Sequence, residues 1–391
     1  MKQAALEKLS RINNHLNGKL TPHDGILGGQ SGLTYYYHYA AHVLGDRSLQ
    51  TKANESLRNI FTTLNEGGGR LAGNCFSAGG AGFAFAVSHL AQHQLLEFDV
   101  DAEFEDLDHY LFEEAKEQLR QGEVDYLHGG MGPFFYFASR QKKTDIIIHY
   151  LNELFQKLMD NAVWEKGGVW FPNFSLQRIT DKHIDFSLAH GLSGILLLVI
   201  EAWPYLKNKK AAHKLLKCGL NFILQCELPT GERIGNCSKF PSSLERDAKS
   251  ISASSRLAWC YGDLNQALLF HRAGLLLGEG LYIDKATETG IASTKRKTEA
   301  ETLSSDAHFC HGSAGLAQFY KCLYHETLQY PYYKAYEYWM KQTIQQVDGE
   351  LNENKYAVNP GGLLDAWTGI AFVLLEYVSA KRLHWSKAFL L

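Results

Sequence analysis

The feature that most constrains the fold of this chain is a motif, Gly-x-x-Gly followed by an apolar stretch, that recurs seven times. The second glycine positions are spaced by 50, 50, 62, 71, 50 and 54 residues, and one copy has asparagine instead: Gly32, Gly82, Gly132, Gly194, Asn265, Gly315 and Gly369. The first glycine is replaced only in the last copy: Gly29, Gly79, Gly129, Gly191, Gly262, Gly312 and Ala366. Internal repeats of this kind are typical of chains whose units stack or close into a ring.

Each copy is followed by a helix-length segment that is apolar on nearly all sides, as in residues 33–44, 192–206 and 370–378. Helices of this kind are buried on most of their surface. Between the copies, residues 53–64 and 212–223 carry apolar residues at amphipathic helical spacing. No run of alternating residues predicts a strand. The sequence therefore predicts an all-α protein, an α/α toroid with about seven inner and seven outer helices, whose inner helices begin at the glycines.

The chain is predicted to form one domain, residues 1–391, because no linker divides it. The two long steps between copies hold irregular segments rich in glycine and proline, near residues 163–185 and 228–254, and such composition predicts long loops. They precede the copies that contain His190 and Cys260. We therefore expect these loops either to overhang a functional site and contact its substrate, or to decorate the surface.

Composition excludes several classes of function. The net charge of the 391 residues is only -3, with no basic stripe of the kind that nucleic acids require, and no apolar run reaches the roughly 20 residues of a membrane span. Residues 1–8 lack the apolar core of a signal peptide, which predicts a cytoplasmic protein. In that reducing compartment the seven cysteines are expected to be thiols or metal ligands rather than disulfides.

Aligning the copies on the second glycine brings reactive residues into register. Cys260 and Cys310 stand five residues before it, and His128, His190 and His311 stand four residues before it. Equivalent positions of a closed ring lie at the same height, so we expect these side chains to converge. Two thiolates and one imidazole suit Zn²⁺ and leave a fourth position open, as in catalytic sites. The alternative is that these are buried thiols beside packed histidines. Because the residues occupy equivalent positions of the repeat, we favour a zinc site of Cys260, Cys310 and His311.

Other residues near this site are candidates for acid–base chemistry. A substrate thiol at the open position would be held as a thiolate, ready to attack a carbon electrophile. His190, which has no cysteine before it, is predicted to be an acid–base group rather than a ligand. Asp125 is either a helix N-cap or a site residue, and Arg256, four residues before Cys260, is either an ion-pair partner or a site residue. His308, a near neighbour of Cys310, is a candidate to contact and orient the metal ligands without binding the metal itself.

The stretches that carry these residues resemble the signatures of a known family. Trp259-Cys260-Tyr261-Gly262, Cys310-His311-Gly312 and Ala189-His190-Gly191-Leu192-Ser193-Gly194 are similar to those of LanC-type lanthionine synthetases, the lantibiotic cyclases. The seven glycine motifs also match the double ring of helices in that family, so the resemblance covers nearly the whole chain. Asn265 departs from it, because the family usually has glycine there, and this puts the local packing of that helix start in doubt.

The resemblance implies a specific reaction. Cys260, Cys310 and His311 would hold Zn²⁺, and a cysteine thiol of a dehydrated precursor peptide would add to a dehydroalanine or dehydrobutyrine of the same peptide, closing a (methyl)lanthionine thioether ring. His190 would protonate the α-carbon. Asp125 would assist His190 or deprotonate the thiol, with Arg256 supporting both.

The implied partners are a precursor peptide with leader and core, a separate dehydratase and a membrane export complex, without nucleic acid. Two alternatives share the resemblance: a protein that adds glutathione or another small thiol to dehydroamino acids, and a non-catalytic, zinc-stabilised scaffold that binds peptides. A carbohydrate-active α/α barrel is a further alternative, but it would require paired carboxylates in the cleft, where this chain has cysteine and histidine.

Overall fold

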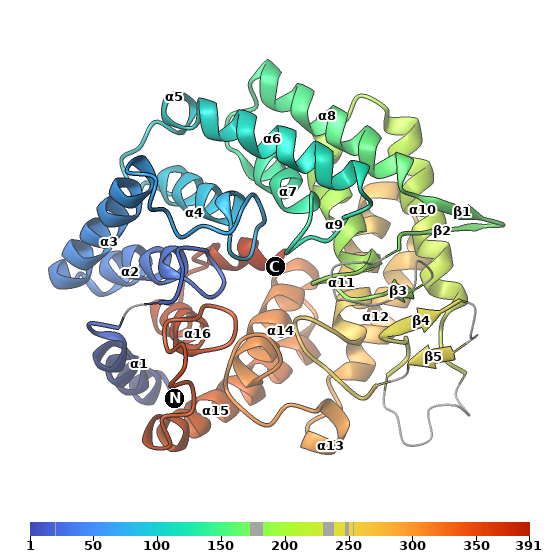
Figure 1. The fold of residues 1–391 in the computed structure, drawn as a ribbon. Helices are drawn as coiled ribbons and strands as arrows, with labels where there is room; N and C mark the ends of the chain where they lie inside the picture. Colours follow the sequence, from blue (N-terminus) through green and yellow to red (C-terminus); the bar gives the residue numbers. More distant parts are fainter. Residues whose placement is uncertain (20, 173–182, 230–237, 247–249, 253) are drawn as a thin grey trace.

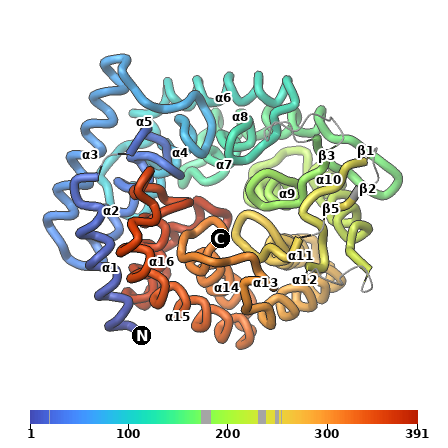
Figure 2. The backbone as a smooth tube through the Cα atoms, turned by 60° about the horizontal axis from the view of Figure 1, so that its bottom comes forward, coloured from blue at the N-terminus to red at the C-terminus, as the bar shows by residue number. Residues whose placement is uncertain are grey.

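The helices of this protein form two concentric rings (Figures 1 and 2). The computed structural model describes residues 1–391 except 20, 173–182, 230–237, 247–249 and 253. The inner ring consists of α2 (Gln30–Leu44), α4 (Gly80–Gln92), α7 (Met131–Ser139), α9 (Leu192–Ala202), α11 (Asp263–Leu277), α14 (Ser313–Thr327) and α16 (Trp367–Ser379). The outer ring consists of α1 (Lys2–Leu16), α3 (Arg47–Asn65), α6 (Glu105–Arg120), α8 (Asp145–Asp160), α10 (Lys209–Gln225), α12 (Gly280–Ser293) and α15 (Tyr330–Asn352).

Packing between consecutive inner helices closes the ring. From α2 through α4, α7 and α9 to α11, each helix packs on the next, and α14 packs on α16, which returns to α2. Between α11 and α14, the guanidinium of Arg272 forms an ion pair with Glu326 at 2.6 Å. Each inner helix also packs against outer helices, for example α2 on α3 and α11 on α12. The predicted α/α toroid is therefore confirmed, with two short additional helices, α5 (Val100–Glu103) and α13 (Glu299–Thr302).

The inner helices begin at the repeated motif because its second glycine has no room for a side chain. A Cβ built at Gly315 would lie 1.8 Å from the carbonyl oxygen of Phe309, six residues earlier in the same turn. The first glycine of the motif is the N-cap of most inner helices, as Gly312 is for α14. In the third copy the N-cap is Gly130, one residue later than the motif predicts.

The sequence predicts loops without strands for the two long segments, and the absence of strands is wrong. There β1 (Val163–Glu165) pairs with β2 (Gly168–Trp170), and β3 (His183–Asp185), β4 (Ser243–Glu245) and β5 (Ser250–Ser252) form a second antiparallel sheet. Each strand has only three residues, too few for an alternating pattern to stand out from the sequence. Residues 173–182, 230–237, 247–249 and 253 of these segments lie outside the described part of the chain.

The axis of the inner ring is filled by residues 385–391, which begin with the 3₁₀ helix η3 (Trp385–Phe389). The end of the chain lies at the centre of the ring in both views (Figures 1 and 2). Trp385 and Phe389 are fully buried there. We call residues 385–391 the axial plug. The centre of the toroid is therefore packed rather than open.

Two further properties bear on the expectations from composition. No helix in the described part of the chain combines the length and the apolar character that crossing a membrane requires. The six described cysteines are free thiols, namely Cys75, Cys218, Cys226, Cys260, Cys310 and Cys322. Cys237, which the sequence assigned to a loop or core thiol, lies outside the described residues.

Candidate metal centre

Cys260, Cys310 and His311 come together at the mouth of the toroid. Their Sγ and ring nitrogen atoms all lie within 4.8 Å of one another, and they form the one such group that could hold a metal among the described residues. Cys260 stands two residues before the N-cap of α11, and Cys310 and His311 directly precede the N-cap of α14. Equivalent positions of the repeat thus bring three donor atoms close together; their role as metal ligands stays a prediction.

Each cysteine changes the acidity of the other. The hydrogen bond from Cys310 is the largest influence on Cys260 and, together with His311 and Arg256, it lowers the pKa of Cys260 to about 6 although burial opposes this. The pKa of Cys310 is raised by the same hydrogen bond and by burial. The lowered pKa of Cys260 favours its thiolate, which is the form that binds a metal. The donor chemistry therefore fits a soft divalent ion such as Zn²⁺.

A belt of backbone hydrogen bonds fixes the height of these residues. At the position five before the second glycine, the N–H of five of the seven copies donates to the carbonyl of the next copy: Leu27 to Ser77 at 3.0 Å, Ser77 to Leu127 at 2.9 Å, Cys260 to Cys310 at 3.4 Å, Cys310 to Leu364 at 2.9 Å, and Leu364 to Leu27 at 3.0 Å. Both cysteines are members of this belt. Their backbones are held by neighbouring copies rather than by their own helices.

Asp125 links the third copy to the fourth. Its Oδ1 accepts hydrogen bonds from the backbone N–H groups of Leu127 and His128 at 2.7 and 2.8 Å, and its Oδ2 lies 2.8 Å from Nδ1 of His190. The carboxylate is buried, whereas the His190 side chain is 15% exposed toward the mouth. The prediction of Asp125 as a helix N-cap is wrong, since the N-cap of α7 is Gly130 and Oδ1 of Asp125 binds the turn before it; its role as a site residue stays a prediction.

Asp125 also decides the charge of His190. Burial is the largest single effect and lowers the pKa of His190, but the hydrogen bond and charge of Asp125, with smaller effects from Asp185 and Cys260, outweigh it. The pKa of His190 is therefore raised above its ordinary value. A histidine held in this way keeps a proton that it can transfer near neutral pH.

Asn265 links the fourth copy to the fifth and explains the missing glycine. Its Oδ1 accepts the N–H of Leu188 at 2.9 Å, and its Nδ2 donates to the carbonyl of Trp259 at 2.8 Å. In this copy the turn passes through Gly262 with a φ of 109°, a left-handed conformation that favours glycine. The departure from the repeat thus adds two buried hydrogen bonds next to Cys260.

These observations can be compared with known proteins. The model of lanthionine synthetase C-like proteins matches residues 23–390. The chain belongs to this family. A solved structure titled nisin cyclase superposes with a TM-score of 0.73 at 19% sequence identity, covering 100% of this chain and 97% of that chain, and this likeness shows a common fold. A search among curated proteins finds no match.

The weaker candidates of the sequence also lie at this mouth. The ring of His128 stacks on His190 with centroids 5.5 Å apart, and its Nδ1 lies 2.9 Å from the Ser77 hydroxyl. The ring of His308 meets His311 edge-on at 4.1 Å. Arg256 contributes its positive charge to both cysteine thiols. The expected neighbourhood of this lanthionine synthetase C-like protein is therefore brought together.

Sequence reasoning missed two acidic residues of the site. Oδ2 of Asp185, at the end of β3, accepts the hydroxyl of Tyr261 at 2.9 Å, which connects the second sheet to the residue after Cys260. Asp365 lies beside the mouth, where burial raises its pKa and the charge of His311 opposes the increase. Asp365 occupies the column of His190 and His311, so the alignment of copies contained its signal.

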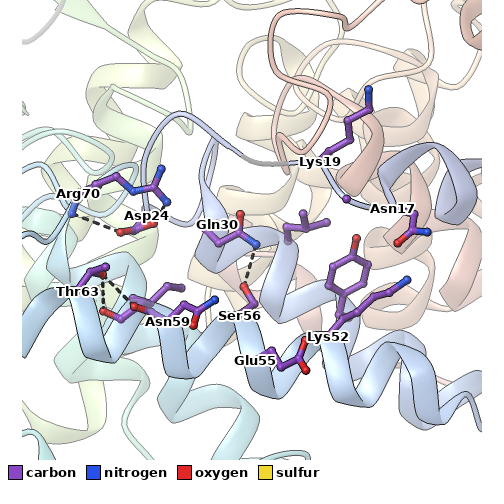
Figure 3. Close-up of a pocket in the computed structure, with 14 residues that line it drawn as sticks. Asn17, Lys19, Asp24, Gln30, Lys52, Glu55, Ser56, Asn59, Thr63 and Arg70 are labelled. Atoms are coloured by element: carbon purple, nitrogen blue, oxygen red, sulfur yellow. Dashed lines mark hydrogen bonds and ion pairs between the residues drawn. The ribbon is translucent and has the colours of Figure 1, made fainter.

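Two cavities of similar size differ in their relation to this mouth. One cavity of about 320 Å³ is lined by residues of five copies, including Gly28, Ser77, His128, His190 and Asp365. Another, of about 370 Å³, lies between the end of α1 and helices α2 and α3 (Figure 3). Its walls carry polar pairs but none of the predicted site residues. Of these two cavities, the one at the mouth is lined by His128 and His190, although not by the three candidate metal ligands themselves.

Proposed function

We propose that this protein is a zinc-dependent cyclase acting on a dehydrated precursor peptide. It would add cysteine thiols to dehydroalanine or dehydrobutyrine residues of the same chain and form (methyl)lanthionine rings. The observation that carries this proposal is the convergence of Cys260, Cys310 and His311 at one mouth with the Asp125–His190 pair. Membership of the lanthionine synthetase C-like family supports the reaction class.

The proposed metal ligands are Cys260, Cys310 and His311. Two thiolates and one imidazole leave a further position for a substrate sulfur on tetrahedral Zn²⁺. When bound, zinc would act as a Lewis acid that stabilises the thiolate form of the substrate cysteine near neutral pH. The lowered pKa of Cys260 supports this assignment, because the protein must supply deprotonated ligands.

The residues of the chain would then direct one proton. The sulfur forms a bond to the β-carbon of the dehydroamino acid, and the electron pair of the double bond moves toward the α-carbon and its carbonyl. We assign proton delivery at the α-carbon to Nε2 of His190, since Nδ1 is engaged by Asp125. The proton given up by the substrate thiol restores His190, so the ring forms without a change in mass. Arg256 would stabilise the thiolates through its charge.

The cavity at the mouth is expected to hold the reacting part of the peptide. Its volume of about 320 Å³ accommodates a short segment rather than a whole precursor. We infer a substrate with a leader and a core, prepared by a separate dehydratase and passed to an export complex. A cytoplasmic location would keep the ligand thiols reduced.

Metal analysis tests the proposed centre. Purified wild type should contain near-stoichiometric zinc, and Cys310→Ala should lose it. Cys218→Ala, which removes a thiol on the outer helix α10, should retain the wild-type content. Wild type without zinc, or a Cys310→Ala protein with full zinc content, would overturn the assignment.

Peptide mass spectrometry tests the reaction. His190→Ala should keep its zinc but leave a dehydrated peptide with a thiol that an alkylating reagent still modifies. Ring closure by wild type protects that thiol without adding mass. Addition of glutathione, which increases the mass, would instead favour the small-thiol alternative, and undiminished ring formation by His190→Ala would remove His190 from the acid role.

A further inference from the structure

The axial plug contacts both cysteine ligands through the residues that precede them. Trp259 and Phe309 stand directly before Cys260 and Cys310, and both side chains are fully buried. Nε1 of Trp259 donates to the carbonyl oxygen of Phe389 at 2.9 Å, and the two rings meet edge-on with centroids 5.0 Å apart. The ring of Phe309 lies 4.3 Å from that of Phe389. One plug residue thus touches the neighbours of both ligands.

The same segment contacts the neighbour of the acid–base pair. The hydroxyl of Tyr126, the residue after Asp125, donates to the carbonyl oxygen of Ala388 at 2.7 Å. The plug is itself anchored to the inner ring, because Nη1 of Arg272 donates to the carbonyl of Leu390 at 2.7 Å. Trp259, Phe309 and Tyr126, which all adjoin site residues, therefore converge on two consecutive positions of the plug, Ala388 and Phe389.

These contacts leave little freedom to the ligand thiols. The N–H groups of Trp259 and Cys260 both donate to the carbonyl of Cys310, so backbone hydrogen bonds connect the two turns that carry the cysteine ligands. The ring of Phe389 contacts the aromatic side chains of both turns, Trp259 and Phe309. A metal site requires its donor atoms within a few tenths of an ångström of their positions, and such precision depends on neighbours that are themselves packed.

We propose that the axial plug is a positioning element of the zinc dithiolate, with Phe389 as its central residue. This inference rests on the proposed function, since it concerns the same metal ligands. Through Trp259 and Phe309, the plug fixes where Cys260 and Cys310 present their sulfur atoms. An ordinary part of the core would contribute only to stability, whereas the buried contacts of the axial plug are expected to contribute to zinc affinity as well.

The decisive variant is Trp259→Phe, which keeps an aromatic side chain but removes the N–H group that donates to the backbone carbonyl of Phe389. Loss of a contact behind metal ligands typically weakens metal affinity by about 10–100-fold, and we expect at least a tenfold loss of zinc affinity in competition with a chromophoric chelator. The Co²⁺-substituted variant should also show altered thiolate charge-transfer and ligand-field bands.

Two matched controls separate positioning from general packing. Trp170→Phe removes another buried tryptophan donor, the bond to Glu165 at 2.7 Å, in a strand that packs on the outer helix α10. Tyr126→Phe removes a bond to the plug beside Asp125 rather than beside a ligand. Both controls should keep wild-type zinc affinity and cobalt spectra, whatever their effect on the unfolding of the zinc-free protein.

The outcomes separate the two proposals. Zinc-binding wild type together with a Trp259→Phe protein whose affinity and cobalt spectrum equal those of Trp170→Phe would overturn the role of the plug alone. Wild type that binds no zinc would overturn the proposed function and this inference with it. If Trp259→Phe does not fold, Phe389→Leu decides, since it keeps the backbone acceptor and changes only the ring contacts; the same tenfold loss is expected, and unchanged affinity would refute the proposal.

Discussion

Replacing Asn265 with the glycine of the other copies should destabilise the protein, although it restores the repeat. Asn265 is fully buried, and its amide pairs the N–H of Leu188 and the carbonyl of Trp259. Asn265→Gly removes both partners at once. Each buried backbone group left without a partner costs about 1–3 kcal/mol, so the two together cost about 2–6 kcal/mol of unfolding free energy.

Asn265→Ala serves as the control for the backbone. Both variants lose the two hydrogen bonds, but glycine in a helix costs a further ~0.5–1 kcal/mol relative to alanine. We therefore expect the alanine variant to show most of the loss and the glycine variant slightly more. A large loss in glycine with almost none in alanine would mean that backbone entropy, and not the amide of Asn265, decides the stability of this turn.

Amide hydrogen exchange gives the most direct measurement. The N–H of Leu188 should be protected in wild type, because the oxygen of Asn265 accepts it in a buried place. In both variants this amide should exchange faster, together with a decrease in denaturation midpoint. If exchange at Leu188 is unchanged and the unfolding free energy falls by less than about 1 kcal/mol, the explanation of the missing glycine is refuted.

Three other predictions follow from the same geometry. Asp125→Asn should lower the pKa of His190, because it removes the charge that outweighs burial, so the decrease in cyclisation rate with rising pH should begin at lower pH than in wild type. The same interaction makes the stability of the folded protein depend on pH. Because the pKa of His190 is higher in the folded protein than the value of about 6.5 in the unfolded chain, the Asp125–His190 pair stabilises the fold fully below that unfolded value, and this contribution is lost as pH rises through the folded pKa. An unfolding free energy of the wild type that increases over that pH range would contradict this reasoning. Gly315→Ala should destabilise the start of α14, since its Cβ would lie 1.8 Å from the carbonyl oxygen of Phe309, whereas Gly349→Ala, with open space around the Cβ, should be neutral or stabilising by about 0.5–1 kcal/mol in thermal unfolding. Removing zinc with a chelator should abolish cyclisation but leave the helical circular dichroism signal intact, because the core of the two rings is independent of the three ligands; loss of that signal would show that the metal maintains the fold.

The sequence predicted the ring because the glycine motif reports a packing requirement. At Gly315 and the glycines equivalent to it, a carbonyl oxygen occupies the place of a side chain, and only the fifth copy, whose turn passes through Gly262 at positive φ, begins its inner helix with a larger residue, Asn265. The same register predicted that Cys260, Cys310 and His311 meet, since the belt of backbone bonds holds equivalent positions at one height. A periodic constraint of this kind is visible in sequence without knowledge of long-range contacts.

Features outside that period could not be predicted. The three-residue strands carry no measurable alternation, and the bond between Asp185 and Tyr261 joins positions 76 residues apart that hold different places in the repeat. The axial plug is a stronger example. Its contact with Trp259 spans 130 residues, and nothing in the local sequence of residues 385–391 distinguishes a ring centre from an ordinary apolar end. These contacts depend on closure of the whole toroid.

The belt explains why Asp125 contacts both its own turn and His190. In the described part of the chain, backbone bonds connect the copies continuously from the fifth through the seventh to the third, but none of them reaches the fourth copy. Side chains make both remaining connections: Asp125 to His190 on one side, and Asn265 to Leu188 on the other. The two carboxylate oxygens of Asp125 have different partners: Oδ1 accepts a hydrogen bond from the backbone of its own turn, and Oδ2 forms a hydrogen bond with His190. In the belt, the fourth copy, which carries the proposed acid, is thus joined to its two neighbours by side chains.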